Sequence, residues 1–375
     1  MQESTGPNTA GLTRRGFIGA ATGAAAGLSG LALSGCSGAA GSEEHGKLRI
    51  PLANSSIGNT WRLEMENTYR AALGAEPYRS QVFGEVYNSS NDMSDQAAQL
   101  SNLISARVDA ILIDAASPTG LNGVVSQAIT RGILVISFDN IVTAPGALQV
   151  NTNQFLFGKK LAMWLTRELK GKGNIIMVTG VPGTFVDVQR NAGAMSVFSK
   201  HPQIKIVNQY SGMWDSAVAQ TNTAAVLPAL PKIDGIWAQG GTDGILKAFQ
   251  AAGRPLPPTA GESENGFRKF MSGAMTGHKL PGYSIGQPTY LVLIALELAR
   301  RVLHHQYPRK NVTVPFQTAT TASVKNGVTV FPHLQDSFFT PITDLSPEHL
   351  VHVPLVEVET GRTTQKTMKV KLPRP

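Results

Sequence analysis

The sequence predicts an α/β protein built from parallel sheets in two lobes, and two observations lead to this prediction. The first is the length of 375 residues, which exceeds one average domain. The second is a regular alternation of short apolar runs with longer amphipathic segments, the order expected for parallel strands joined by helices. Hydrophobic residues make up 42% and charged residues 15% of the chain, a balance that suits a folded globular protein.

The first part of the chain contains four predicted strands separated by helices. Each strand is a short run rich in apolar residues that leads into a polar loop. The segment Asp92–Ala106 illustrates the helices, because its apolar residues Ala97, Leu100, Leu103 and Ile104 recur at helical spacing. The predicted strands are Leu48–Ala53, Val82–Tyr87, Asp109–Asp114 and Ile133–Phe138, and the predicted helices are Trp61–Leu73, Asp92–Ala106 and Leu121–Thr130.

The second part repeats this alternation, so we expect a second lobe of the same kind, after which the chain re-enters the first. The predicted strands are Ile175–Thr179, Ile204–Tyr210, Gly235–Ala238, Thr259–Ala260 and Tyr283–Gly286. The predicted helices are Phe155–Leu169, Val188–Ser199, Ser216–Leu227, Gly244–Ala252, Gly266–Met275 and Tyr290–His304. From Val312 onward an alternation of apolar and polar residues indicates strands and loops, and the tail from Leu355 is predicted to form an edge hairpin.

The first 46 residues have the pattern of an export signal followed by a tether. Arg14 and Arg15 precede a weakly hydrophobic run, which resembles a twin-arginine signal. The run ends in Leu-Ser-Gly-Cys36, which resembles the bacterial lipobox, whose cysteine is lipidated and becomes the new N-terminus. Two acyl chains suffice for stable anchoring in a membrane. We therefore expect residues 1–35 to be a signal peptide, Cys36 to carry the lipid, and residues 36–46 to include a flexible tether.

Charge and motif content argue against several classes of protein. The net charge is +8, but the basic residues are scattered and do not interleave with aromatics, so no nucleic-acid partner is expected. No serine lies in a Gly-x-Ser-x-Gly elbow and no nucleophile stands beside a base, so no catalytic residue is predicted. The eight histidines lack metal-ligand spacing, and Gly240-Gly241 lacks the lysine of a phosphate loop. Neither a metal nor another cofactor is expected, and a single cysteine excludes an intrachain disulfide.

Polar side chains gather in the loops that follow the predicted strands. Ligands of open parallel sheets bind outside the carboxyl ends of the strands, so these loops are expected to meet at one site. Carboxylates, carboxamides and arginines suit the recognition of vicinal hydroxyls, and Trp61 and Trp214 suit the two faces of a sugar ring. The predicted ligand-binding residues are Ser55, Asn59, Trp61, Arg62, Asp139, Asn140, Asp187, Arg190, Trp214, Gln239, Asp243, Glu262, Glu264 and Gln287. The alternatives are tryptophans that belong to the core and an Asp139 that caps a helix or lies on the surface.

From about Lys47 to about residue 320, the chain resembles the ribose/galactose-type periplasmic substrate-binding proteins of bacterial ABC importers, the type I periplasmic binding proteins. The motifs that carry the resemblance are Asn59-Thr60-Trp61, Ile133–Asn140, Arg190, Trp214-Asp215 and Ile285–Pro288. Two motifs depart from the family pattern. Gly240-Gly241 stands where the family commonly has a ligand-binding Asn, and Glu262-Ser263-Glu264 stands where a strand commonly ends in Phe-Asp.

The resemblance implies two Rossmann-like lobes joined by a three-segment hinge, with the ligand in the cleft between them. The N-terminal lobe would comprise residues 47–152 and 288–317, and the C-terminal lobe residues 153–287 and 318–375. The crossovers would lie near Thr152-Asn153, Gln287-Pro288 and Gln317-Thr318. Closure of the lobes on the ligand would follow from contacts that each lobe makes only when the ligand bridges both.

The function implied is that of an extracytoplasmic solute-binding lipoprotein. It would capture a small sugar or sugar alcohol as a monomer and deliver it to the permease and ATPase subunits of an ABC transporter. It would work in the periplasm or at the outer face of the cell membrane, held there by its lipid anchor. Pentoses, hexoses, deoxysugars and sugar alcohols all remain open as ligands.

Three other functions are compatible with a related fold. A sugar-responsive repressor would need an N-terminal helix-turn-helix, where the export signal stands instead. An exported α/β enzyme would need the nucleophile and base that the sequence lacks. A sensor that presents a sugar to a membrane receptor has no sequence feature to separate it from a transport protein, and one chain can serve both roles.

Overall fold

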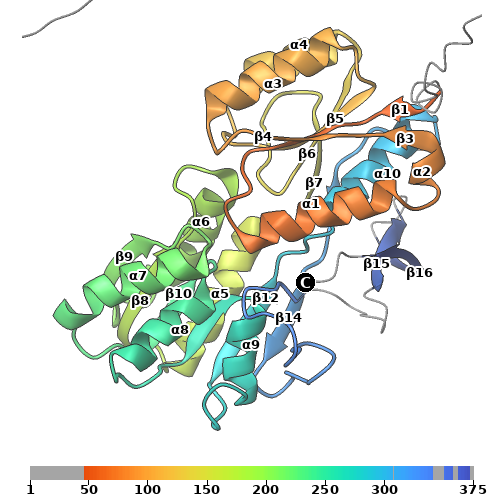
Figure 1. The fold of residues 1–375 in the computed structure, drawn as a ribbon. Coiled ribbons are helices and arrows are strands. Elements are labelled where there is room, and N and C mark those ends of the chain that lie inside the picture. The colour runs from red at the N-terminus through yellow and green to blue at the C-terminus, as the bar shows by residue number, and fades with distance from the viewer. Residues whose placement is uncertain (1–45, 307, 341–349, 358–361, 372–375) are drawn as a thin grey trace, which may run out of the picture. The chain divides into compact units, whose positions relative to one another are not determined.

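The computed structural model describes residues 46–306, 308–340, 350–357 and 362–371. It contains two six-stranded sheets, each with helices packed against both faces, and two small two-stranded sheets (Figure 1). The α/β class with two lobes of parallel sheet is therefore confirmed. The predicted signal peptide, Cys36 and most of the tether lie outside the described residues, and the lobe boundaries stay predictions.

The first sheet has the strand order β13-β7-β6-β5-β2-β4 and is parallel throughout. Its strands are β2 (Leu52–Asn54), β4 (Val86–Asn88), β5 (Ala110–Asp114), β6 (Leu134–Phe138), β7 (Leu148–Asn151) and β13 (Val312–Thr313). Four helices accompany it: α1 (Thr60–Leu73), α3 (Met93–Ser105), α4 (Asn122–Thr130) and α10 (Leu291–Leu303). Strand β7 was not predicted, because only Leu148 and Val150 of its four residues are apolar and they form no continuous apolar run.

The second sheet has the order β14-β12-β11-β10-β8-β9 and is parallel except at its edge, where β14 runs antiparallel to β12. Its strands are β8 (Gly173–Thr179), β9 (Ile204–Ser211), β10 (Gly235–Ala238), β11 (Thr259–Glu262), β12 (Gly282–Gly286) and β14 (Gln317–Thr320). The accompanying helices are α5 (Gln154–Glu168), α6 (Phe185–Phe198), α7 (Ser216–Val226), the 3₁₀ helix η1 (Leu227–Ala229), α8 (Thr242–Ala251) and α9 (Asn265–Ser272).

Alternate residues of each central strand enter different cores, because successive side chains of a strand point to opposite faces. In β5, Ala110 and Leu112 join the core beneath α1 and α10, whereas Ile111 and Ile113 join the core beneath α3 and α4. Strand β8 divides its residues in the same way between the two cores of the second sheet. Strands covered on both faces become continuously apolar, which is why these runs were recognisable in the sequence.

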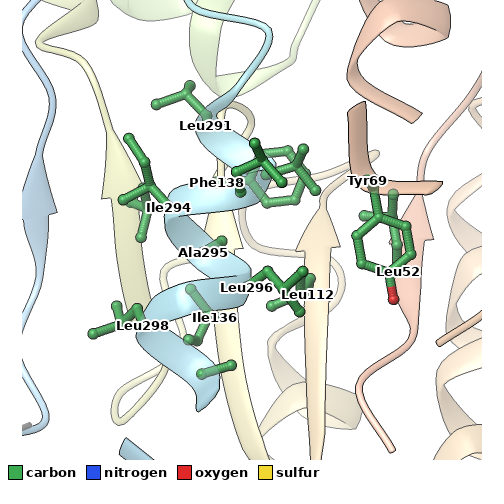
Figure 2. Close-up of a cluster of buried hydrophobic side chains, with 14 of the residues drawn as sticks. Leu52, Tyr69, Leu112, Ile136, Phe138, Leu291, Ile294, Ala295, Leu296 and Leu298 are labelled. Carbon is green, nitrogen blue, oxygen red and sulfur yellow. The ribbon is translucent and has the colours of Figure 1, made fainter. Parts of the chain in front are cut away.

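Helix α10 follows strand β12 of the second sheet in the chain but packs against the first sheet. Figure 2 shows Leu291, Ile294 and Leu298 of this helix in one apolar cluster with Leu112 and Ile136 of the first sheet. The predicted re-entry of the chain into the first lobe is thus present in the structure. Two further segments connect the sheets: one leads from β12 to α10, and the other leads from β13 to β14.

Two predicted strands are each divided in the structure. Leu48–Ala53 becomes β1 (Leu48–Arg49) and β2, with Pro51 at the break, where no backbone N–H is available for a ladder. Val82–Tyr87 becomes β3 (Val82–Phe83) and β4, and Gly84 lies at the break against the Tyr69 hydroxyl. Strands β1 and β3 pair with each other, and a short helix α2 (Tyr78–Gln81) directly precedes β3.

The C-terminal tail forms a hairpin of β15 (Leu350–Glu357) and β16 (Arg362–Lys371). It pairs with neither six-stranded sheet in the described part of the chain, so the predicted hairpin is present but its predicted place at a sheet edge is wrong. No helix among the described residues is long and apolar enough to span a membrane.

Candidate functional site

A pocket of about 310 Å³, including its part open to solvent, lies where loops from the carboxyl ends of both sheets meet. Its walls combine two tryptophans, two arginines, two carboxylates and two carboxamides with two apolar side chains. The lining residues are Asn59, Trp61, Arg62, Asp139, Val186, Arg190, Trp214, Glu262, Gln287 and Phe339.

The first wall comes from the start of α1. The Asn59 side chain accepts a hydrogen bond from the Arg62 backbone N–H at 3.0 Å and so caps the helix, which places Trp61 and Arg62 in its first turn. The Arg62 guanidinium lies 2.9 Å from Asp114 at the end of β5, and both side chains are buried. Burial raises the pKa of Asp114 to about 7, although Arg62 opposes this shift.

Asp139 follows β6 and has a left-handed backbone conformation, with φ of 54°. Its side chain accepts hydrogen bonds from the Gln287 amide at 2.7 Å and from the Asn140 amide at 3.0 Å. Burial raises the pKa of the Asp139 carboxyl, and the charges of Arg62 and Arg190 oppose this rise. Asp139 is buried and caps none of the helices in the described part of the chain. The alternative of a helix cap or a surface acid is therefore wrong.

The second wall centres on Arg190 of α6. Its guanidinium lies 2.8 Å from Glu262 at the end of β11, donates to the Gln239 carbonyl at 2.9 Å, and is 3.8 Å from the centre of the Phe157 ring. Burial raises the pKa of Glu262, and the neighbouring Arg190 counteracts it. These contacts fix the position of Arg190 before any ligand arrives.

Trp214 lies against Gly180, where any side chain would overlap the indole: an added Cβ would lie 2.0 Å from its nearest ring atom. Its indole N–H donates to the Gln239 side chain at 3.2 Å. Trp61 donates its own indole N–H to the Gln287 carbonyl at 3.0 Å. Both tryptophans are largely buried, and both also border the pocket, so the core and pocket interpretations apply together.

Gln287 connects the two walls. It lies just after β12, and its side chain donates to Asp139 at 2.7 Å and accepts from the Thr152 hydroxyl at 2.6 Å. Its backbone N–H donates to Glu262 at 3.3 Å. A buried polar network therefore runs from the strand ends of the first sheet, through this connecting segment, to the arginine of the second.

Six of the predicted ligand-binding residues do not line this pocket, because their side chains are buried or bonded elsewhere. Asn140 accepts the Val186 N–H at the start of α6, and Asp187 accepts from Gly180 and Gln239. Asp243 pairs with Lys247 at 2.8 Å. The residues concerned are Ser55, Asn140, Asp187, Gln239, Asp243 and Glu264.

Glu264 illustrates why such positions were over-predicted. It lies only two residues after Glu262, but it turns away from the pocket and accepts the Gly241 N–H at 2.6 Å. Burial, reinforced by Glu262 and Asp243, raises its pKa to about 8. Position after a strand identified both carboxylates, but it did not say which one faces the site.

Two lining residues, Val186 and Phe339, were missed. Val186 lies between Phe185 and Asp187 in the first turn of α6 and has no polar signal. Phe339 lies far beyond the last predicted crossover, and nothing in its sequence surroundings indicates a site. Among the described residues, no group of histidine, cysteine or carboxylate side chains could hold a metal ion.

The pocket's chemistry favours an uncharged, polar ligand. Arg62 and Arg190 supply donors, Asp139 and Glu262 supply acceptors, and their formal charges cancel. The two indoles add apolar area for the carbon skeleton of such a ligand. We find no nucleophile placed beside a base on the pocket wall.

Comparisons with known proteins agree with this architecture. Residues 50–306 match the model of the periplasmic binding protein domain. The xylitol-binding protein of Mycolicibacterium smegmatis is 29% identical over 266 residues, which cover 68% of this chain and 74% of that protein. The D-ribose/D-allose-binding protein of Pseudomonas aeruginosa is 28% identical over 220 residues, covering 56% of this chain and 68% of that protein.

Among solved structures, an ABC transporter solute-binding protein from Thermobispora bispora is similar, with a TM-score of 0.66 and 28% identity. The alignment covers 72% of this chain and 84% of that one. The family match extends over more than half of the chain and confirms the resemblance found in the sequence. The chain therefore belongs to the periplasmic binding protein domain family, which consists of binding proteins and not of enzymes.

Proposed function

We propose that this protein captures a small sugar or sugar alcohol outside the cytoplasm and delivers it to an ABC transporter permease. The observation that supports this most is the charge-balanced pocket with its two indole walls. Paired arginines and carboxylates can donate hydrogen bonds to neighbouring hydroxyls of a ligand and accept hydrogen bonds from them. The similar proteins named above bind xylitol and ribose or allose, which are ligands of this chemistry.

Closure of the two lobes about the three predicted crossovers is part of the proposal. Strand β7 ends at Asn151 in the first sheet, and α5 of the second lobe begins at Gln154. Gln287 and the segment between β13 and β14 make the other two passages. A ligand that bonds to Asp139 and Arg190 together favours the closed state, because only that state brings both residues to it.

A thermal-shift screen of alditols and aldoses, followed by calorimetry, tests the proposed function, because a ligand that binds the folded state raises its melting temperature. Replacing Asp139 with Ala is expected to weaken binding of the best ligand by about 2–5 kcal/mol, since buried partner groups are left unpaired. Asp95→Ala, which removes an exposed acid, is the matched control. A wild-type protein that binds no member of the panel would refute the proposed function.

The membrane anchor is a separate part of the proposal and depends only on sequence. Cys36 is taken to be the lipidation site, and Arg14-Arg15 to select the twin-arginine export route. Replacing Cys36 with Ala is expected to release the exported protein from membranes into the soluble fraction, since both acyl chains are lost. Retention of the variant on membranes to the same extent as wild type would contradict the lipobox.

A further inference from the structure

The segment Phe331–Thr340, here called the strap, follows β14 and lies outside the residues that match the family model. It is fastened to the start of α9 through Asn265. The Asn265 side chain accepts the Phe331 N–H at 2.8 Å and donates to the Phe331 carbonyl at 2.8 Å. The Asn265 N–H donates to the Phe338 carbonyl at 2.7 Å. One buried asparagine therefore holds both ends of the strap.

Further contacts fix the strap to helices α8 and α9 and to the loop before α9. Asp336 forms ion pairs with Lys247 and Lys269, each at 2.9 Å. At the end of the strap, Thr340 donates its hydroxyl to the Ser263 carbonyl at 2.7 Å, and its own carbonyl accepts from the buried Arg268 at 2.9 Å. So many partners leave the strap little freedom to move away from the second lobe.

Phe339 is the point at which the strap reaches the first lobe. Its N–H donates to the Glu64 carboxyl at 2.8 Å, and Glu64 lies on α1, one turn after Trp61. Its side chain is only 3% exposed and shares the core cluster of the first sheet with Trp61. On the other flank, Phe339 forms an antiparallel bridge with Glu264. The residue is thus held from both lobes.

The Phe339 side chain also lines the ligand pocket, together with Trp61 and Trp214. We propose that Phe339 is a specificity-determining residue, which the strap brings to the pocket wall and which limits the length of the ligand. This inference rests on the proposed function. The Phe339 ring packs against the core, and backbone hydrogen bonds hold the residue on both flanks. The ring therefore cannot move aside to make room for a longer carbon chain.

The test compares Phe339→Ala and Phe339→Leu with wild type in calorimetric titrations of erythritol, xylitol and sorbitol, alditols of increasing length. The control is Phe338→Ala, which shortens the neighbouring strap side chain and leaves the pocket lining unchanged. One missing methylene in an apolar pocket changes discrimination by about 10–200-fold. We therefore expect Phe339→Ala to reduce the preference for the best alditol over the next longer one by about tenfold or more. The preference of Phe339→Leu is expected to lie between those of wild type and Phe339→Ala. Phe338→Ala is expected to keep the wild-type preference.

The outcomes separate the two proposals. If wild type binds an alditol and both Phe339 variants keep its order of preference and its affinities, Phe339 does not determine specificity. If Phe338→Ala changes the preference as much as Phe339→Ala does, the effect belongs to strap folding and the inference is overturned. Should Phe339→Ala fail to fold, Phe339→Leu decides alone, because it keeps most of the buried volume. A wild-type protein that binds no alditol or aldose in the preceding screen overturns the proposed function itself, and this inference with it.

Discussion

Each of the two sheets presents the pocket with an arginine on a buried carboxylate, but the two pairs are embedded differently. Arg62 bonds to Asp114 and to Asn54, both at the strand ends of its own sheet. Arg190 bonds to Glu262, and Glu262 also accepts the backbone N–H of Gln287. The first pair is therefore local, whereas the second is joined to the segment that connects the sheets.

The protonation chemistry of the two pairs differs as well. Burial raises the pKa of Asp114 to about 7, so this carboxyl can take up a proton near neutral pH when its arginine is removed. Burial raises the pKa of Glu262 as well, but this carboxyl also accepts the Gln287 backbone N–H, which favours its charged form. The difference indicates that the first lobe tolerates the loss of its pair better than the second. It also indicates that changes at Arg190 affect the connection between the lobes.

The largest effect is expected from Arg190→Met. Removing one partner of a buried ion pair typically costs about 3–5 kcal/mol of folding stability, because an uncompensated charge remains. The same change at Arg62 is expected to cost about 1–3 kcal/mol, since Asp114 can be neutralised by a proton. Urea unfolding of both variants at pH 6.5 measures this. Equal losses would show that the bond from Glu262 to the connecting segment has no energetic consequence.

The comparison also explains what could be predicted from the sequence. Apolar runs covered on both faces gave the strands, and Gly235–Ala238 was predicted with its observed bounds. Position after a strand also predicted Arg190, Glu262 and Asp139, which do line the pocket. Position cannot give the direction of a side chain, and so Glu264 was predicted together with Glu262. Hydrophobic periodicity identifies strands and helices, but it does not show in which direction the side chain of a loop residue points.

Phe339 was beyond sequence reasoning for a different reason. Its place in the pocket depends on contacts between residues more than 70 positions apart, namely those that join the strap to Ser263 and to Glu64. No local pattern specifies such a contact. The short strand β7 was missed because only two of its residues, Leu148 and Val150, are apolar, and they form no continuous apolar run. Ligand contact by the lining residues stays a prediction that the binding experiments decide.

A smaller effect is expected in the pH dependence of folding stability, and it comes from Glu264, a buried residue that does not line the pocket. The raised pKa of Glu264, about 8 against an ordinary value of 4.5, means that the folded protein holds a proton that the unfolded chain releases. Stability from this group is therefore fully present below about pH 4.5 and declines as the pH rises towards 8, by at most about 1.4 kcal/mol per pH unit.

Replacing Glu264 with Gln is expected to flatten the decline in melting temperature between pH 5 and pH 8 relative to wild type, by about a few degrees at pH 8. Because Glu264 does not line the pocket, affinity for the ligand at pH 5 is expected to stay unchanged. Scanning calorimetry across this pH range provides the measurement. An unchanged slope would place the titration elsewhere, and Asp114 is then the next buried carboxyl to replace.

The smallest effects are expected from the two tryptophans, for which the contrast is reversed: the tryptophan of the first wall is joined to the connecting segment, and that of the second wall is bonded locally. Trp214 donates its N–H to Gln239, within the second lobe, whereas Trp61 donates to the carbonyl of the connecting residue Gln287. Replacing either by Phe removes one hydrogen bond and some contact area, a loss of about 0.5–1.5 kcal/mol in affinity. The larger loss is expected for Trp61→Phe, because its bond also ties α1 to the segment between the lobes.

Ligand titrations followed by intrinsic fluorescence measure both variants. Trp164 and Trp237 do not line the pocket and supply a constant background. Each variant is expected to lose part of the ligand-induced change; full signal and wild-type affinity in both would mean that the ligand does not lie between the two indoles.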